Sequence, residues 1–197
     1  MRKIPAEYEN PLDNILIGLA DSCCPLFRSM GFTPNGITTI SLLFGLLAVW
    51  ALWKGKIWVF CVCYLLSYFF DCLDGHYARK YDQVTKLGDA YDHIKDITVG
   101  VALIIVLYKR NKDRCSSRIL TAVIACVVIF TVLGYVHLGC QERVYGHDQS
   151  STLNLGRKLC PGNAHESIKW SRYVGMGTWV VVIMLSVVIL EKTQICS

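Results

Sequence analysis

Long uncharged apolar runs dominate the pattern of hydrophobic and polar positions along the chain. Three of them, residues 36–53, 119–138 and 173–190, are each about long enough to cross a hydrocarbon core of roughly 30 Å. Two shorter runs, residues 57–70 and 97–108, become spanning helices if both extend into the aspartate-rich stretch between them. The pattern predicts an all-α integral membrane protein, a bundle of five or six transmembrane helices.

Residues 11–31 follow a different, amphipathic pattern. Apolar side chains recur at helical spacing, namely Leu12, Ile15, Leu16, Leu19, Cys23, Leu26 and Phe27. The spacing fits an N-terminal interfacial helix, a short helix packed on the bundle outside the bilayer, or the sixth span. We expect a single membrane-embedded domain over residues 1–197, with residues 141–172 as its long polar loop.

The composition agrees with a membrane protein. Hydrophobic residues make up 53% of the 197 residues and charged residues only 18%, unlike the balance of an ordinary soluble domain. The net charge of +5 suits loops that face anionic lipid, and no nucleic-acid motif is present. Most of the ten cysteines are expected to be small packing residues. Cys140 and Cys160 bracket the polar loop and could pair in an oxidising compartment.

An acidic stretch, residues 70–96, reads FDCLDGHYARKYDQVTKLGDAYDHIKD and contains six aspartates. Charged groups at the mouth of membrane segments are costly and usually functional. Two sets of residues recur at helical spacing and share one face each: Asp71, Asp74, Gly75 and Ala78 on the first helix, and Gly88, Asp92 and Asp96 on the second. Because only a few residues join the helices, we expect them to be antiparallel neighbours whose carboxylates face each other.

Four aspartates in a low-dielectric groove cannot all stay ionised unless cations lie between them. Two divalent ions would balance the four charges, and an all-oxygen set of ligands favours a hard cation such as Mg²⁺ over Zn²⁺. Small residues beside the acids leave room for a base or a diphosphate, and Arg79 can donate to a phosphate oxygen. The stretch therefore predicts a metal-assisted pocket for a nucleotide diphosphate at the membrane surface.

Two other interpretations stay open from the residues alone. Aspartates at helix ends are often solvated residues or caps, and an interfacial arginine can simply extend to the headgroups. Transporters and channels also place carboxylates between helices. Asp89 and His93, beside the two stripes, are expected to be ordinary interfacial residues.

The acidic stretch also resembles a known signature. The pattern D-x2-D-G-x2-A-R-x8-G-x3-D-x3-D is met without a gap by Asp71, Asp74, Gly75, Ala78, Arg79, Gly88, Asp92 and Asp96. It is the signature of the CDP-alcohol phosphotransferases, and TPNGIT, residues 33–38, is similar to that family's usual entry to its first span. The resemblance implies a membrane enzyme that transfers a substituted phosphate from a CDP-linked donor to an alcohol, releasing CMP, in phospholipid biosynthesis.

The resemblance also implies roles for the matching residues. Asp71, Asp74 and Asp92 would bind two divalent ions, Mg²⁺ or Mn²⁺, while Asp96 would contact a metal and act as general base. Gly75, Ala78 and Gly88 would make room for the cytidine, and Arg79 would steady the diphosphate. The family usually has six spans and tends to form homodimers. If the organism is eukaryotic, the endoplasmic reticulum membrane is expected, with the active site facing the cytoplasm.

Two subfamilies are similar to different parts of the motif. DGHYAR, with YLLS shortly before it, is similar to the phosphatidylinositol synthases, which use CDP-diacylglycerol and a polar alcohol. GDAYDH resembles the choline and ethanolamine phosphotransferases, which use CDP-choline or CDP-ethanolamine and diacylglycerol. The short chain favours the first reading. An inactive relative that only binds a CDP-lipid, or an ion-handling membrane protein, is the alternative from another class.

Overall fold

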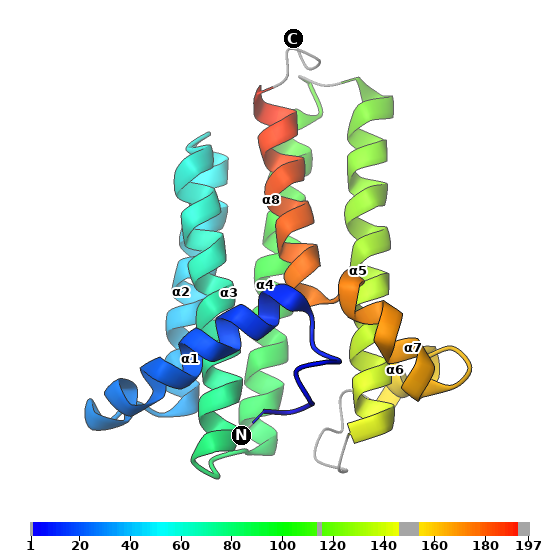
Figure 1. Ribbon diagram of the computed structural model, residues 1–197. Coiled ribbons are helices and arrows are strands. Elements are labelled where there is room, and N and C mark those ends of the chain that lie inside the picture. The colour runs from blue at the N-terminus through cyan, green and yellow to red at the C-terminus, as the bar shows by residue number, and fades with distance from the viewer. Residues whose placement is uncertain (1, 114–115, 146–153, 193–197) are drawn as a thin grey trace.

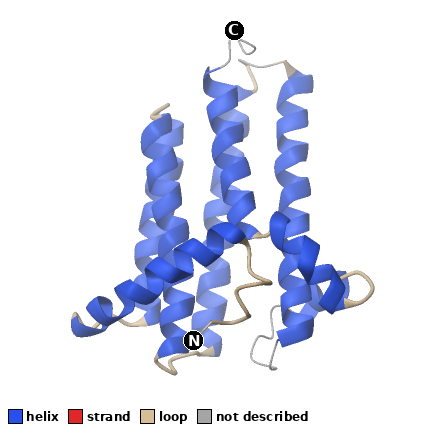
Figure 2. Ribbon diagram, in the orientation of Figure 1, coloured by secondary structure: helices blue, strands red, loops and turns tan. Residues whose placement is uncertain are grey.

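The computed structural model describes residues 2–113, 116–145 and 154–192, which fold into helices without any strand (Figures 1 and 2). In chain order the helices are α1 (Pro11–Ser29), α2 (Pro34–Trp53), α3 (Ile57–Lys80), α4 (Lys86–Asn111), α5 (Ser117–Tyr145), α6 (Asn154–Leu159), α7 (Ala164–Ser171), the short 3-10 helix η1 (Arg172–Val174) and α8 (Met176–Lys192). The prediction of an all-α fold is confirmed.

Helices α2, α3, α4, α5 and α8 stand side by side as a bundle, and α1 crosses the front of it obliquely (Figure 1). Four helical segments are long and apolar enough to cross a membrane: Pro34–Trp53, Ile57–Lys80, Arg118–Tyr145 and Ala164–Glu191. The last of these includes α7 and η1 besides α8. Helix α4 has 26 residues, about 39 Å at ~1.5 Å per residue, but the polar residues of its first half keep it outside this group. The structure therefore supports four spans, and a fifth or sixth stays a prediction.

Both short apolar runs extend into the acidic stretch, as predicted. Helix α3 continues to Lys80 and α4 begins at Lys86, so all eight signature positions lie on helices. Asp82 turns the chain between them with φ of 53°, in the left-handed region. Thr85 then caps α4, because its side chain accepts a hydrogen bond from the Gly88 backbone N–H at 3.0 Å. A cap of the same kind begins α2, where the Thr33 side chain accepts from Gly36 N at 3.2 Å.

Helix α2 holds α3 and α4 in place by packing against both. The Ser41 hydroxyl donates to the Ser67 carbonyl at 2.8 Å, and the Ser67 hydroxyl donates to the Ser41 carbonyl at 2.8 Å. One turn further along α2, a Cβ at Gly45 would lie 2.7 Å from Val99 Cγ2 of α4. Helices α3 and α4 are antiparallel, as predicted (Figure 1), but each packs mainly against α2 and not against the other as a direct neighbour.

The residues expected to form a polar loop, 141–172, are largely helical, so that prediction is wrong. Helix α5 continues to Tyr145, and α6 and α7 follow, while residues 146–153 lie outside the described part of the chain. Ile168 of α7 is fully buried and packs in a small cluster with Ile4 and with Cys140. Short amphipathic helices gain stability from such packing without needing a long apolar run. Cys140 and Cys160, the candidate pair, form a disulfide bond.

Helix α1 is anchored to the start of α8 by buried polar contacts. The Asn10 side chain caps α1 and also donates to the Arg172 carbonyl at 2.7 Å and to the Thr178 hydroxyl at 2.9 Å. Asp13 is buried and accepts a hydrogen bond from the Tyr68 hydroxyl at 2.7 Å. Any side chain at Gly177 would collide with Asp13 Oδ1. The helix predicted over residues 11–31 is thus present and packed on the bundle, and its position relative to the membrane interface stays a prediction.

We expect the stability of the protein to fall with rising pH because of Asp13. Burial raises the pKa of this carboxyl to about 7. A carboxyl whose pKa is higher in the folded state stabilises that state fully below its unfolded pKa of about 4, and this contribution is lost as the pH rises through 7. Thermal unfolding in detergent, measured at about pH 5 and about pH 8, should show a smaller pH difference for Asp13→Asn than for the unchanged protein. Equal differences in the two proteins would contradict the assignment to Asp13.

Candidate metal and nucleotide site

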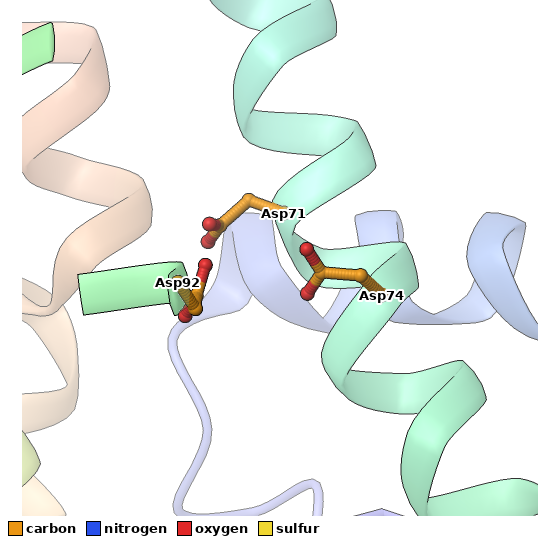
Figure 3. A group of neighbouring side chains, drawn as sticks. All are labelled: Asp71, Asp74 and Asp92. Carbon is orange, nitrogen blue, oxygen red and sulfur yellow. The ribbon is translucent and has the colours of Figure 1, made fainter. Parts of the chain in front are cut away.

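Three aspartates from two helices converge on a shared space. Asp71 and Asp74 come from α3 and Asp92 from α4, and each offers a carboxylate oxygen such that the three oxygens lie within 4.8 Å of one another. Figure 3 shows the side chains pointing toward a shared space. Asp74 is buried and the other two are partly buried. The prediction that the two carboxylate stripes face each other is confirmed for these three residues.

The donor atoms of the cluster fit a divalent cation. Asp74 Oδ2 is buried and accepts no hydrogen bond within the part of the chain that the structure describes. A buried oxygen without a partner costs free energy, which a coordinated ion would recover. All donors are carboxylate oxygens, the ligands that Mg²⁺ and Mn²⁺ prefer. The residues present therefore suit a hard metal ion.

Lys95 is the site residue that the sequence reasoning missed. Its side chain is only 3% exposed, and its ammonium forms ion pairs with Asp71, with Asp92 Oδ1 at 3.1 Å and with Asp96 Oδ1 at 2.7 Å. The Ser41 hydroxyl of α2 is 3.5 Å away. The spacing of Asp92 and Lys95, three residues apart on one helix, was the available signal for this pairing.

Asp96 stands apart from the other three aspartates. It is not one of the three residues whose oxygens converge, and its side chain is 52% exposed. Its described ion pair is with Lys95. Among the aspartates of the signature, Asp96 is thus the one most open to a molecule arriving from outside.

A cavity of about 570 Å³ opens beside the acids, within the size range of small-molecule sites. Its walls include six of the signature residues: Asp74, Gly75, Ala78, Arg79, Gly88 and Asp92. Arg2 and Lys3 from the N-terminal segment, and Glu142 and Tyr145 from α5, also line it. This contribution was not predictable from the sequence, because these residues lie far from the signature along the chain.

The small residues of the signature stand where the structure is crowded. A Cβ at Gly75 would lie 3.3 Å from Arg79 Nη1, so the glycine leaves space for the guanidinium group. A Cβ at Gly88 would lie 3.1 Å from Asn35 Oδ1, so this glycine allows α2 and α4 to approach. Arg79 Nε is buried without a hydrogen-bond partner among the described residues, while the side chain lines the cavity. The expected roles of these residues toward a nucleotide stay predictions.

Asp89 and His93 make a contact of their own on α4. His93 Nδ1 lies 2.7 Å from the Asp89 carbonyl oxygen, one helical turn earlier. Asp89 lines the cavity, but it is not part of the converging group of three carboxylates. We assign no role in the site to either residue.

The family model described as CDP-alcohol phosphatidyltransferase matches residues 32–195, which include every signature position and both helices of the acid cluster. No curated protein and no solved structure matches the chain. Because the match covers most of the sequence, and the structure brings the signature aspartates of α3 and α4 together beside one cavity, the chain belongs to the CDP-alcohol phosphatidyltransferase family.

Proposed function

We propose that this protein transfers a substituted phosphate group from a CDP-linked donor to an alcohol acceptor and releases CMP. Its family transfers phosphatidyl groups from CDP-alcohols in phospholipid synthesis and generally depends on divalent metal ions. The observation that carries the proposal is the convergence of Asp71, Asp74 and Asp92 beside a cavity that Arg79 also lines. Such a cluster suits a diphosphate better than an ion-conducting path, because phosphate oxygens need both metal and guanidinium partners.

In this proposal Asp71, Asp74 and Asp92 hold the metal, and a metal held there would supply positive charge to the phosphate oxygens. Arg79 donates hydrogen bonds to the diphosphate from the cavity wall. Gly75 and Ala78 leave the surface of α3 open to the cytidine.

Asp96 is proposed as the general base for the acceptor. It takes the proton of the acceptor hydroxyl, whose oxygen forms a bond to the phosphorus of the substituted phosphate. The bond from that phosphorus to the bridging oxygen breaks, and CMP leaves with the electron pair. The partial exposure of Asp96 supports this role, because an acceptor hydroxyl can reach its carboxylate.

For the substrates, we propose CDP-diacylglycerol as the donor and a small polar alcohol such as inositol as the acceptor. The DGHYAR and YLLS segments support this choice. The segment GDAYDH supports the second candidate, CDP-choline or CDP-ethanolamine with diacylglycerol. Either reaction yields a phospholipid.

CMP release by purified protein in detergent tests the proposal. With Mg²⁺ or Mn²⁺ present, CDP-diacylglycerol is offered with inositol, serine or glycerol 3-phosphate, and CDP-choline or CDP-ethanolamine is offered with diacylglycerol. Turnover with one pair would establish the reaction and identify the substrates. Failure of every pair with folded, metal-loaded protein would instead support an inactive CDP-lipid-binding relative or an ion-handling protein.

We further propose a homodimer in the endoplasmic reticulum membrane, with the active site facing the cytoplasm, as the family resemblance implies. The disulfide opposes this orientation. Cys140 lies on α5 shortly before the cavity-lining residues Glu142 and Tyr145, and disulfides persist in oxidising compartments. The exposed position 166 allows a test of the orientation. In sealed vesicles of known orientation, a membrane-impermeant maleimide would label Glu166→Cys only from the side that the site faces. Chemical crosslinking in the same vesicles would test the dimer.

A further inference from the structure

The buried position of Lys95 bears on the number of metal ions in the site. Four carboxylates alone would be balanced by two divalent ions, which is the count that the sequence predicts. Lys95 adds a further positive charge on a side chain that is 3% exposed. If two ions were bound before substrate arrived, this ammonium would be a buried charge without compensation, which is strongly unfavourable.

The ammonium also occupies one half of the acid cluster. It pairs with Asp71, Asp92 and Asp96, which are the carboxylates that an ion next to Asp96 would need. Among the described residues Asp74 takes part in no ion pair, and its Oδ2 atom is buried without a hydrogen-bond partner. The cluster is thus divided into a side whose carboxylates form ion pairs with Lys95 and the Asp74 side, which forms no ion pair among the described residues.

We infer that Lys95 takes the place of the second metal ion in the substrate-free protein, so that one divalent ion binds, on the Asp74 side. This inference rests on the proposed assignment of the acid cluster as the metal site. In it, Lys95 is a positioning residue that determines how many metal ions bind. The Ser41 hydroxyl, 3.5 Å from Lys95 Nζ, helps to hold the ammonium at the α2–α4 contact. A second ion can enter only when it arrives with the negative charge of a diphosphate or displaces the ammonium.

Counting bound Mn²⁺ in the purified protein without any substrate tests this inference. We expect one tightly bound Mn²⁺ per chain for the unchanged protein and for Lys95→Arg, which keeps the charge, but two for Lys95→Met, which removes it. Lys86→Met is the matched control, because Lys86 is exposed at the first turn of α4, outside the cavity lining; it should bind one ion. Two tight ions in the unchanged protein, none in it, or one in Lys95→Met would each overturn the inference.

Thermal unfolding supplies a second readout that does not depend on catalysis. In excess EDTA, Lys95→Met should unfold several degrees below the unchanged protein, because three carboxylates lose their cation, and Mn²⁺ should restore the lost stability. If Mn²⁺ raised the unfolding temperature of both proteins equally, the ammonium would not be standing in for an ion. Metal counting needs no substrate, so it tests this inference separately from the proposed function. If the Mn²⁺ counts were as expected but no donor gave CMP release, the proposed function would be refuted and this inference would stand.

Discussion

Asp74→Asn is expected to lower metal-dependent CMP release about 10³-fold. A bound metal supplies several kcal/mol of transition-state stabilisation, and about 1.4 kcal/mol corresponds to a tenfold change in rate. Asp74 is the aspartate most dependent on that metal, because Lys95 forms ion pairs with the other three signature aspartates and Asp74 forms none among the described residues. Steady-state CMP release as a function of Mn²⁺ concentration measures the effect.

The same exchange should leave folding intact, which separates loss of metal from loss of structure. Asparagine has the shape of aspartate but places no charge in this buried position, so the metal-free protein should unfold at the same temperature or higher. Mn²⁺ should raise the unfolding temperature of the unchanged protein and not that of Asp74→Asn. Asp113→Asn is the control, since this aspartate is 83% exposed just beyond the other end of α4. Full Mn²⁺-dependent stabilisation of Asp74→Asn would show that the ion binds elsewhere.

Asp96→Asn is expected to reduce the turnover number about 10²- to 10⁴-fold, the range for removal of a general base. Unlike Asp74→Asn, it should retain the tightly bound Mn²⁺, because Asp96 is outside the converging group of three carboxylates. Lys95 keeps Asp71 and Asp92 as partners, so the site should stay assembled. Single-turnover CMP formation together with Mn²⁺ counting separates the two roles.

The two possible failures of this prediction carry different meanings. A variant that turns over normally would exclude Asp96 as the base. A variant that loses both turnover and Mn²⁺ would make Asp96 a metal ligand, as the family resemblance also implies. The comparison of Asp74→Asn with Asp96→Asn thus distinguishes an aspartate that binds the metal from one that receives the proton.

Much of the site was predictable from sequence because its spacing is local. Asp71 and Asp74 are three residues apart, and Asp92 and Asp96 four, so each pair shares a helix face wherever the helix packs. The turn between the helices contains five residues, Tyr81 to Thr85, which forces α3 and α4 to be antiparallel. The extension of two apolar runs into a charged stretch was predictable for the same reason, since only helices could place these acids on common faces.

The arrangement of the N-terminal and later segments was not predictable in this way. Residues 141–172 look polar because α6 and α7 are too short to need a long apolar run, and only the packing of Ile168 and Cys160 against α5 reveals them as helices. Arg2, Lys3 and Glu142 reach the cavity through contacts between segments that are distant along the chain. No periodicity within a single helix encodes such contacts.

The sequence by itself determined the membrane character of the chain and the helices that carry the signature. It also determined the helix face on which each aspartate lies. Apolar run length and the 3.6-residue period are local properties of the chain. Only the tertiary structure decided that α2 stands between α3 and α4 as their common packing partner. It also placed Lys95 among three of the aspartates, because which faces meet depends on close packing of small residues such as Gly45 against Val99. The charge balance of the site is therefore a property of the packed bundle.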